Sequence, residues 1–448
     1  MNQRWTLHVE NFARIKEADI EISPLMCFIG DNNSGKSYMM SLLWGIIANS
    51  YSIFYGLHNH CDKTEKCKCC TEWLSKNIGK TVTITDDVEK MYIDWFNELI
   101  SKYKDSLLKN IFNYEIKAQK IEIRNFSRTE KLSVQIWDFN SGKFNRDKLT
   151  ENQILLEIHS YEDTLESSNF ILCWYLLMEN LTRINESLMD RETPIYLPAS
   201  RTGFLLTYPQ IASKSIGAYY SLKNDNDKLQ ETLTAPYIQF LQLLIKMKNS
   251  TDELQDKNKD ALVKFLDNEI VKGTVRAKKD GSVIRYQPDD MTDEIPMSIT
   301  SSVVTEIATL LLLLKTRLPL RLIIIEEPEA HLHPALQKKI AQLLIRFVHS
   351  GVPIWITTHS DTILQHFNNM IKLNNRPEQE RDELLEQFNY TKDDLLSPDE
   401  INLYQFTRED THTTIKSLES GKYGFVVPSF NKAIDELMQE IFAFQGNE

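Results

Sequence analysis

The sequence lacks the features that would place it in a membrane, in a coiled-coil protein or on bulk nucleic acid. The longest apolar run of its second half, Leu310 to Leu314, ends at Lys315 and is far too short to span a membrane. The start, Met1 to Leu7, has no apolar segment of the kind found in signal peptides. The formal net charge of −12 argues against binding of nucleic acid by the overall charge of the protein. A local basic groove that binds nucleic acid is still compatible with it. We therefore expect a cytoplasmic protein with no membrane contact.

Repeats and low-complexity segments are also lacking, and the helical pattern over 226–270 is too short for a coiled-coil arm. The composition, with 42% apolar and 25% charged residues, is that of an ordinary globular protein. A chain of 448 residues is long enough for two or three domain-sized units and a large core.

A phosphate-binding loop is the most informative motif of the chain. Gly30-Asp-Asn-Asn-Ser-Gly-Lys-Ser37 fits the pattern G-x-x-x-x-G-K-[ST]. An apolar run that favours a buried strand, Leu25 to Ile29, precedes it, and a run that favours a buried helix, Tyr38 to Ala48, follows it. This context predicts that the loop binds ATP or GTP, with the helix N-terminus facing the phosphates. A Gly/Asn-rich turn before a helix is the alternative.

Each residue type in this loop has a chemical reason. Glycines allow the backbone to wrap an anion closely and to point its N–H groups inward. Lys36 would pair with the β- and γ-phosphates, and the Ser37 hydroxyl would bind Mg²⁺. The expected nucleotide contacts of this loop are Gly30, Asn32, Asn33, Ser34, Gly35, Lys36, Ser37 and Tyr38.

The last quarter of the chain predicts a second part of the same site. The apolar run Leu318 to Ile325 reads as a strand buried on both faces. A helix over Pro334 to Val348 and a strand over Val352 to Thr357 complete a βαβ unit. Glu326 and Glu327 follow the first of these strands, at the sheet edge where ligands bind in α/β proteins. We expect Glu326 to hold the Mg²⁺ shell and Glu327 to polarise the water that attacks the nucleotide in hydrolysis. The alternative is that the strand simply ends in an exposed charged turn.

These segments resemble a known family. Glu326-Glu-Pro-Glu-Ala-His-Leu-His-Pro334, followed by Ile356-Thr-Thr-His-Ser360, resembles the Walker B, D-loop and H-loop of ABC-type ATPases. It looks most like the overcoming-lysogenisation-defect (OLD) branch and the Septu-like or PARIS-like ATPases of bacterial anti-phage modules. Asn11 to Ile15, the loop itself and Tyr196-Leu-Pro-Ala-Ser-Arg201 look like the same branch.

The resemblance implies a head-to-head dimer or a higher oligomer in which two heads enclose two ATP molecules. His359 would sense the γ-phosphate, and Ala330 to His333 would lie along the dimer seam. Ser301 and Ser302, before an expected helix over Val303 to Leu314, would form the signature that contacts the partner's ATP. Relatives commonly have glycine after the two serines, where this chain has Val303, so we expect slow turnover. Simple helix capping by the serines is the alternative.

Arg201 follows the apolar segment Ile195 to Pro198 and has two interpretations. It contacts phosphate or a partner, or it forms a surface ion pair.

A cluster of cysteines and histidines marks the region after the first head segment. In a reducing cytosol such clustering favours metal over disulfides, and a structural Zn²⁺ site and surface thiols on a loop both fit it. The spacing is not the usual C-x₂-C pair. The candidate ligands are His58, His60, Cys61, Cys67, Cys69 and Cys70.

Together these patterns predict an α/β fold: an ABC-type P-loop NTPase head with a mixed sheet, a mixed α+β insertion and a helical insertion. The head is expected over 1–50, 191–225 and 271–372. The mixed insertion with the Cys/His cluster covers 51–190, and the helical insertion covers 226–270. An acidic C-terminal extension covers 373–448.

The predicted function is an ATP-hydrolysing switch subunit of an anti-phage defence complex, with ATP and Mg²⁺ as cofactors. Residues 373–448 lack the clustered carboxylates of the nuclease domain that often follows in OLD relatives. The effector, a nuclease or toxin, is therefore expected on a separate polypeptide. The alternative is a DNA-repair or chromosome-maintenance ATPase that binds DNA directly through a basic hairpin. That hairpin carries Lys272, Arg276, Lys278, Lys279 and Arg285.

Overall fold

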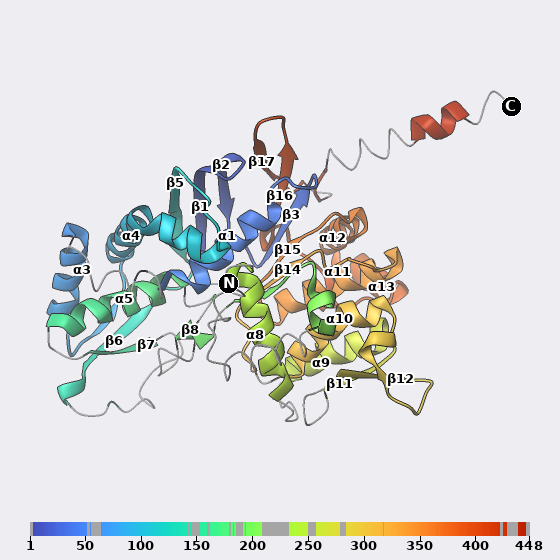
Figure 1. The fold of residues 1–448 in the computed structure, drawn as a ribbon, viewed down its shortest axis with the longest axis horizontal. Coiled ribbons are helices and arrows are strands. Elements are labelled where there is room, and N and C mark those ends of the chain that lie inside the picture. The colour runs from blue at the N-terminus through green and yellow to red at the C-terminus, as the bar shows by residue number, and fades with distance from the viewer. Residues whose placement is uncertain are drawn as a thin grey trace, which may run out of the picture. The chain divides into compact units, whose positions relative to one another are not determined.

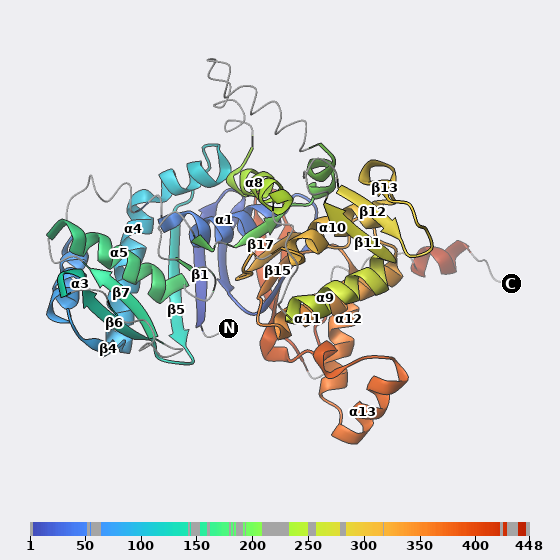
Figure 2. The same cartoon turned by 90° about the horizontal axis from the view of Figure 1, so that it is seen from below.

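The computed structural model describes residues 3–51, 54, 64–141, 144, 153–158, 162–178, 181, 183–184, 191–192, 194–207, 233–249, 257–277, 284–316, 318–421, 424–427 and 438–444. The chain divides into two compact units, and each unit draws on separated stretches of sequence. Unit 1 comprises Met1–Ile22 and Ser41–Pro194, and unit 2 comprises Ser23–Met40 and Ile195–Glu448. Figures 1 and 2 show the helices and strands of both units from two directions.

The sheet of unit 2 has the strand order β10–β14–β15–β3–β16–β17. The first five strands pair in parallel, and β17 is antiparallel to β16, so the sheet is mixed. The bounds of these strands are β3 Leu25–Gly30, β10 Ile195–Leu197, β14 Ile323–Glu326, β15 Ile354–Thr357, β16 Ile401–Arg408 and β17 Thr413–Leu418. The order confirms the predicted α/β class with a mixed sheet.

The central strands of this sheet are buried on both faces, as their unbroken apolar runs predict. Every residue of β14 and β15 is buried, and so are Leu25 to Ile29 of β3. Helix α11 (Pro334–His349) connects β14 to β15 and packs on the sheet, which confirms the predicted βαβ unit. Strand β14 is shorter than the predicted run from Leu318. Pro319 supplies no N–H to a ladder, and Leu318 packs against the core outside the strand.

The remaining helices of unit 2 contribute apolar residues to the same core, α10 with most of its length and α13 with Leu385 and Leu384. In Figure 2, α11 and α12 are drawn side by side next to β15, in agreement with their contacts. The bounds are α8 Ala235–Asn249, α9 Lys257–Leu266, α10 Ser302–Leu314, α12 Asp361–Asn374 and α13 Glu378–Gln387. A small antiparallel sheet contains β11 Gly273–Ala277, β12 Ile284–Pro288 and β13 Ile295–Pro296. Its first two strands confirm the predicted hairpin, whose turn residues lie outside the described part.

Strand β16 requires a correction to the interpretation of 373–448 as an acidic extension. It pairs in parallel with the P-loop strand β3 from Ile401 opposite Leu25 to Phe406 opposite Gly30. The predicted extension therefore contributes to the sheet that carries the P-loop. The other predicted domain boundaries remain predictions.

Unit 1 contains an antiparallel sheet of order β2–β1–β5 and a second sheet of order β4–β6–β7. Helices α3, α4 and α5 pack on one another, α4 packs on β5, and α5 packs on β7. The strands are β1 Gln3–Phe12, β2 Ile15–Glu21, β4 Thr81–Thr83, β5 Lys120–Arg128, β6 Ser133–Asp138, β7 Gln153–Ile158, β8 Arg183–Ile184 and β9 Arg191–Glu192. The helices are α3 Glu65–Lys76, α4 Asp86–Phe112 and α5 Glu162–Met178, while α1 (Lys36–Ala48) begins in unit 2 and continues into unit 1. Within 51–190 the described elements include both helices and strands, while β1, β2 and α1 precede this range.

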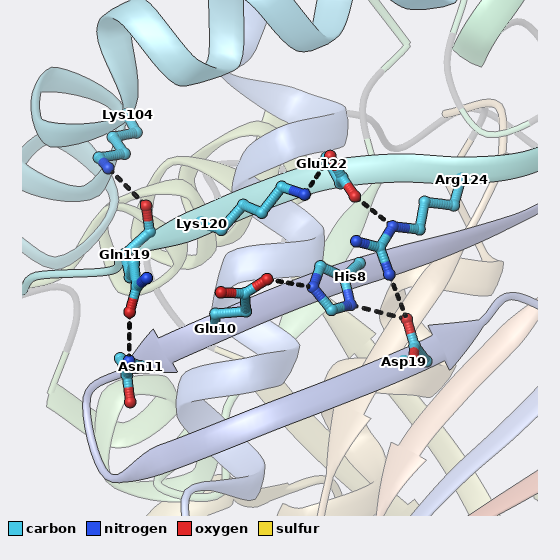
Figure 3. Close-up of polar contacts among 9 residues, drawn as sticks. All are labelled: His8, Glu10, Asn11, Asp19, Lys104, Gln119, Lys120, Glu122 and Arg124. Atoms are coloured by element: carbon cyan, nitrogen blue, oxygen red, sulfur yellow. Dashed lines mark hydrogen bonds and ion pairs between the residues drawn. The ribbon is translucent and has the colours of Figure 1, made fainter.

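One face of the β2–β1–β5 sheet carries a charged network centred on His8 (Figure 3). The cross-strand neighbours of His8 are Asp19 on β2 and Glu122 on β5. Its Nδ1 lies 2.9 Å from Asp19 Oδ1, and its Nε2 lies 3.0 Å from Glu10 Oε1. Arg124 lies between Glu122 and Asp19. Side-chain contacts therefore join the three strands of this sheet in addition to their backbone pairing.

Among the residues that the structure covers, no helix is both long enough and apolar enough to cross a membrane.

Candidate nucleotide-binding site

The P-loop lies between β3 and α1 and has the backbone shape of an anion-binding turn. Gly30, Asn33 and Gly35 have φ values of 123°, 57° and 96°, in the region that favours glycine and asparagine. Helix α1 begins directly after the loop, at Lys36. The N-terminal N–H groups of the helix are therefore available at the loop, as a phosphate site requires.

Gly30 also has a packing reason that the motif does not reveal. A Cβ atom at this position would lie 1.9 Å from the carbonyl oxygen of Phe406 on β16. The same oxygen accepts a hydrogen bond from the backbone N–H of Asp31 at 3.2 Å. The Asp31 carboxylate in turn accepts one from the backbone N–H of Arg408 at 2.9 Å. Strand β16 thus fastens the start of the P-loop.

Lys36 is buried, and its Nζ donates to the carbonyl oxygens of Gly30 at 3.0 Å and Asp31 at 2.8 Å. Burial lowers the pKa of Lys36 from its ordinary value, against the opposing effect of the carboxylates of Glu327, Asp31 and Glu329. The ammonium group is therefore surrounded by negative charge from the loop and from the turn after β14. The ammonium group is held inside the P-loop, where an incoming phosphate would compete with the carbonyl oxygens of Gly30 and Asp31 for its hydrogen bonds.

The other predicted loop contacts are distributed between surface and interior. Asn32, Asn33, Ser37 and Tyr38 are exposed, and Ser34 is buried. The Ser34 hydroxyl has no hydrogen-bond partner among the described residues. An orphaned hydroxyl inside a phosphate loop and an exposed hydroxyl at Ser37 are compatible with a bound nucleotide and its Mg²⁺.

The two carboxylates that end β14 have different surroundings. Glu326 is buried, and its oxygens accept hydrogen bonds from the Tyr196 hydroxyl at 2.9 Å and from the Ala199 N–H at 3.1 Å. Each oxygen keeps a second lone pair, so a water of a Mg²⁺ shell remains compatible with this arrangement. The side chain of Glu327 is 43% exposed and is open to solvent.

Glu327 and His359 lie together. Glu327 Oε1 is 3.9 Å from His359 Nε2, although the two residues come from different strand ends. Burial and the charge of Lys36 lower the pKa of His359, and Glu327 opposes this. The imidazole is therefore neutral near pH 7 and can both donate and accept a hydrogen bond. The structure brings Glu327, His359 and Lys36 into one electrostatic group.

Backbone geometry fixes this group. Glu327 has φ 45°, and its N–H donates to the carbonyl oxygen of Thr357 on β15 at 2.8 Å. His331, four residues later, has φ 59°. Two non-glycine residues in the left-handed region bracket the turn that the resemblance assigns to Walker B and the D-loop. Such conformations cost about 1–3 kcal/mol each and persist where surrounding contacts hold them.

Glu329 belongs to the same site, although the sequence analysis did not select it. Its Oε1 accepts a hydrogen bond from the backbone N–H of His359 at 2.6 Å. Burial raises the pKa of this carboxyl group above its ordinary value. Its place two residues after Glu327, in a turn that begins with proline, was the available signal.

The structure shows that Arg201 forms an ion pair, as one of the two interpretations expects, but a buried one and not one at the surface. The side chain is 3% exposed and therefore is not a surface ion pair. It donates to the carbonyl oxygens of Glu326 at 2.7 Å and Glu327 at 3.1 Å and forms an ion pair with Glu306 at 3.0 Å. The guanidinium is thus occupied by its own chain.

Ser301 is the N-cap of α10 and accepts a hydrogen bond from the N–H of Val304 at 3.4 Å. Ser302 is the first residue of the helix and is exposed. The capping alternative therefore holds for Ser301. The exposed hydroxyl of Ser302 and the free N–H groups of the first turn remain available to an anion.

The described part of the Cys/His cluster forms no zinc site, and Cys67 and Cys70 are core residues. They lie one turn apart on α3 and are buried with Leu74, while Cys69 is exposed on another face. Burial raises the pKa of Cys70, which disfavours the thiolate that a metal needs. Among the described residues, the metal-capable group consists of His8, Glu17 and Asp19. His58, His60 and Cys61 lie outside the described residues.

The solved structures that match the chain include three SMC heads, each at low similarity. One is an SMC head bound to the C-winged helix domain of ScpA, with 11% identity and a TM-score of 0.36; the match covers 93% of this chain and 98% of that chain. A Pyrococcus furiosus Smc head with an extended coiled coil, bound to the C-terminal domain of ScpA, has 11% identity and a TM-score of 0.37, with 98% and 100% covered. The SMC head from Thermotoga maritima has 10% identity and a TM-score of 0.33, with 94% and 100% covered. No curated protein sequence matches the chain.

A sequence family does match, and it covers both parts of the site. The family described as AAA ATPase domain matches residues 6–364, which include the P-loop, the turn after β14 and His359. The matched region is well over half of the 448 residues. This protein is therefore a member of the AAA ATPase domain family, with a P-loop ATPase fold.

Proposed function

We propose that this protein binds Mg²⁺-ATP at the P-loop and hydrolyses it with Glu327 as the general base. The proximity of Glu327 and His359, within the electrostatic reach of Lys36, is the observation that carries the proposal. These three residues come from the P-loop and from the ends of β14 and β15, and no structural role requires their charged groups to gather at one sheet edge.

Each residue then has one task. Lys36 leaves the carbonyl oxygens of Gly30 and Asp31 and pairs with the β- and γ-phosphates. Glu327, the more exposed carboxylate, accepts a proton from the attacking water, and neutral His359 donates a hydrogen bond to the γ-phosphate. Ser37 and Glu326 are the residues that would hold Mg²⁺, Ser37 directly and Glu326 through a bound water. The ion would neutralise charge on the phosphates.

We further propose that the chain works as a switch and not as a fast enzyme. Ser302 and the first turn of α10 would contact the ATP of a second copy, so that ATP closes a dimer and hydrolysis opens it. Support comes from the exposed hydroxyl of Ser302. Two features would slow turnover: Val303 replaces the glycine of relatives, and Lys36 must break two hydrogen bonds before it meets phosphate.

The proposed biological role is control of a separate nuclease or toxin in an anti-phage complex. Two segments support this role, because both resemble the OLD branch: residues 326–334 and residues 196–201. Purification from the native operon tests it. A neighbour-encoded subunit that co-purifies in stoichiometric amount supports the role, and repeated isolation without one rejects it.

Direct DNA binding is the second candidate, and one observation favours it. Arg276 and Arg285 lie directly opposite each other on β11 and β12, which concentrates positive charge on the hairpin, although Arg276 also interacts with the Asp267 carboxylate of the chain itself. ATPase activity stimulated by duplex DNA and lost as salt rises would favour this candidate. Lys278 and Lys279 lie outside the described residues.

Hydrolysis itself is tested by phosphate release from purified protein. Lys36→Ala should lose nucleotide binding, whereas Lys416→Ala, which removes an exposed lysine of β17, should behave as the unmodified protein. Equal phosphate release by all three proteins would reject the proposed site.

A further inference from the structure

A buried ion pair between Arg201 and Glu306 connects the N-terminal part of α10 with the turn that carries Glu327. Arg201 and Glu306 have side-chain exposures of 3% and 1%, and their charged groups lie 3.0 Å apart. Glu306 is on α10, four residues after Ser302. Arg201 follows β10, in a segment whose Tyr196 and Ala199 also hold the Glu326 carboxylate.

The arginine uses its planar fork on several acceptors at once. One guanidinium nitrogen, Nη1, donates to the carbonyl oxygens of Pro198 and Glu326. The other, Nη2, donates to the carbonyl oxygen of Glu327 and pairs with the Glu306 carboxylate. A lysine has the same charge but a single nitrogen, so it cannot make these contacts together. The bond to the Glu327 carbonyl matters most, because Glu327 is held in a left-handed conformation.

The glutamate is a junction as well. Besides its ion pair with Arg201, the carboxylate accepts a hydrogen bond from the Thr202 hydroxyl at 2.6 Å. His331, in the predicted D-loop, lies 3.9 Å away. One carboxylate on α10 therefore contacts the Arg201 segment and approaches the turn after β14. A displacement of α10 would move it relative to both.

We propose that Arg201 and Glu306 are positioning residues, which couple the position of α10 to the placement of the Glu327 carboxylate within the same chain. The inference rests on the proposed hydrolysis by Glu327. An anion that engages Ser302 and the first turn of α10 would shift Glu306, and the shift would reach the Glu327 backbone through Arg201. The signature region would thereby set the activity of its own chain's catalytic turn, in addition to any contact with a partner's ATP.

A purely structural ion pair would affect stability but would not change the chemical step selectively. Weakening a buried pair destabilises a protein wherever the pair lies. A control is therefore needed in which the same substitution weakens a comparable pair away from the site. Arg346 and Asp394 supply it: Arg346 on α11 donates to a fully buried Asp394 at 2.6 and 3.1 Å.

The experiment compares Arg201→Lys with Arg346→Lys in the full chain. The readouts are the dissociation constant of a fluorescent ATP analogue, kcat and KM for ATP, and the thermal unfolding midpoint. For Arg201→Lys we expect ATP affinity and KM within about twofold of the unmodified protein and kcat reduced about 10- to 100-fold, since small misplacements of catalytic groups have effects of this size. Arg346→Lys should lower the unfolding midpoint and leave kcat within about twofold, because its pair touches no residue of the catalytic turn.

Two milder variants keep the test decisive if Arg201→Lys does not fold. Glu306→Gln keeps the shape of the side chain and removes its charge, and Thr202→Val removes one hydrogen bond to the carboxylate. Both should lower kcat more than they raise KM, with the larger effect for Glu306→Gln. Unchanged kcat in every folded variant, or equal losses for Arg201→Lys and Arg346→Lys, overturns the coupling. If instead the unmodified protein releases no more phosphate than Lys36→Ala, the proposed function has failed and not the coupling alone.

Discussion

Replacement of Gly30 by alanine tests how strand β16 and the P-loop depend on each other. The new Cβ would lie 1.9 Å from the Phe406 carbonyl oxygen, while real Cβ atoms keep at least 3.0 Å, so the two must separate by 3.0 − 1.9 = 1.1 Å. A displacement of that size away from Gly30 takes the 3.2 Å hydrogen bond from Asp31 N–H to the same oxygen out of range.

The expected cost has two parts. Alanine at φ 123° costs about 1–3 kcal/mol, and overpacking against a backbone that cannot rotate away costs about 1–3 kcal/mol more. Gly351→Ala is the matched control, since Gly351 has φ 85° and nothing within 4 Å of its Cβ position. It should lose only a conformational part of similar size, about 1–3 kcal/mol. The difference between the two variants isolates the contact with β16.

Urea denaturation followed by tryptophan fluorescence measures these costs, and binding of a fluorescent ATP analogue reports the P-loop. Trp355 is fully buried on β15, next to β3, and contributes to the signal. We expect Gly30→Ala to be less stable than Gly351→Ala and to lose nucleotide binding. Equal stability of the two variants, with ATP binding intact in both, would refute the close approach of β16 to the loop.

Three further outcomes are expected. Hydrogen bonds from Arg346 and the Thr391 backbone overcome burial and hold the pKa of Asp394 below its ordinary value; this carboxylate therefore stabilises the fold above about pH 4 and loses that effect as pH falls through its folded-state pKa. Asp394→Asn should be less stable at pH 7 and show a shallower loss of stability in acid denaturation, and an unchanged acid profile would contradict this. Cys69 should react with a thiol reagent in the folded protein far faster than buried Cys70, and equal rates would contradict their placement on α3. Because Cys67 and Cys70 are buried in the core, their replacement by serine should not change the zinc content of the purified protein, and a loss of bound zinc in these variants would contradict their role as core residues.

The sequence predicts the nucleotide-binding parts of the fold well because they carry local signals. The glycines and lysine of the P-loop, the apolar runs of β14 and β15 and the amphipathic α11 each fix their own structure within a few residues. The α/β class with a mixed sheet follows from their order along the chain.

Long-range pairing is where local patterns give no information. Ile401 and Leu25 are paired in the sheet, although nearly the whole chain separates them in sequence. Neither strand has a local pattern that indicates the other as its neighbour. Arg201 illustrates the same limit for side chains, because its burial depends on Glu306 and on carbonyl groups after β14. The spacing of Cys67, Cys70 and Leu74 is that of one buried helix face, and the same cysteines also fit a metal site, so the residue types alone do not separate the two.

The direct test of hydrolysis at this site is the Glu327→Gln variant. It keeps the shape of the side chain and removes the base. Turnover should fall at least about 100-fold, the usual contribution of a general base. ATP should still bind, stay unhydrolysed on the protein through gel filtration and hold it as a dimer. If Glu327→Gln hydrolyses ATP at the rate of the unmodified protein, Glu327 is not the base and the proposed mechanism is wrong.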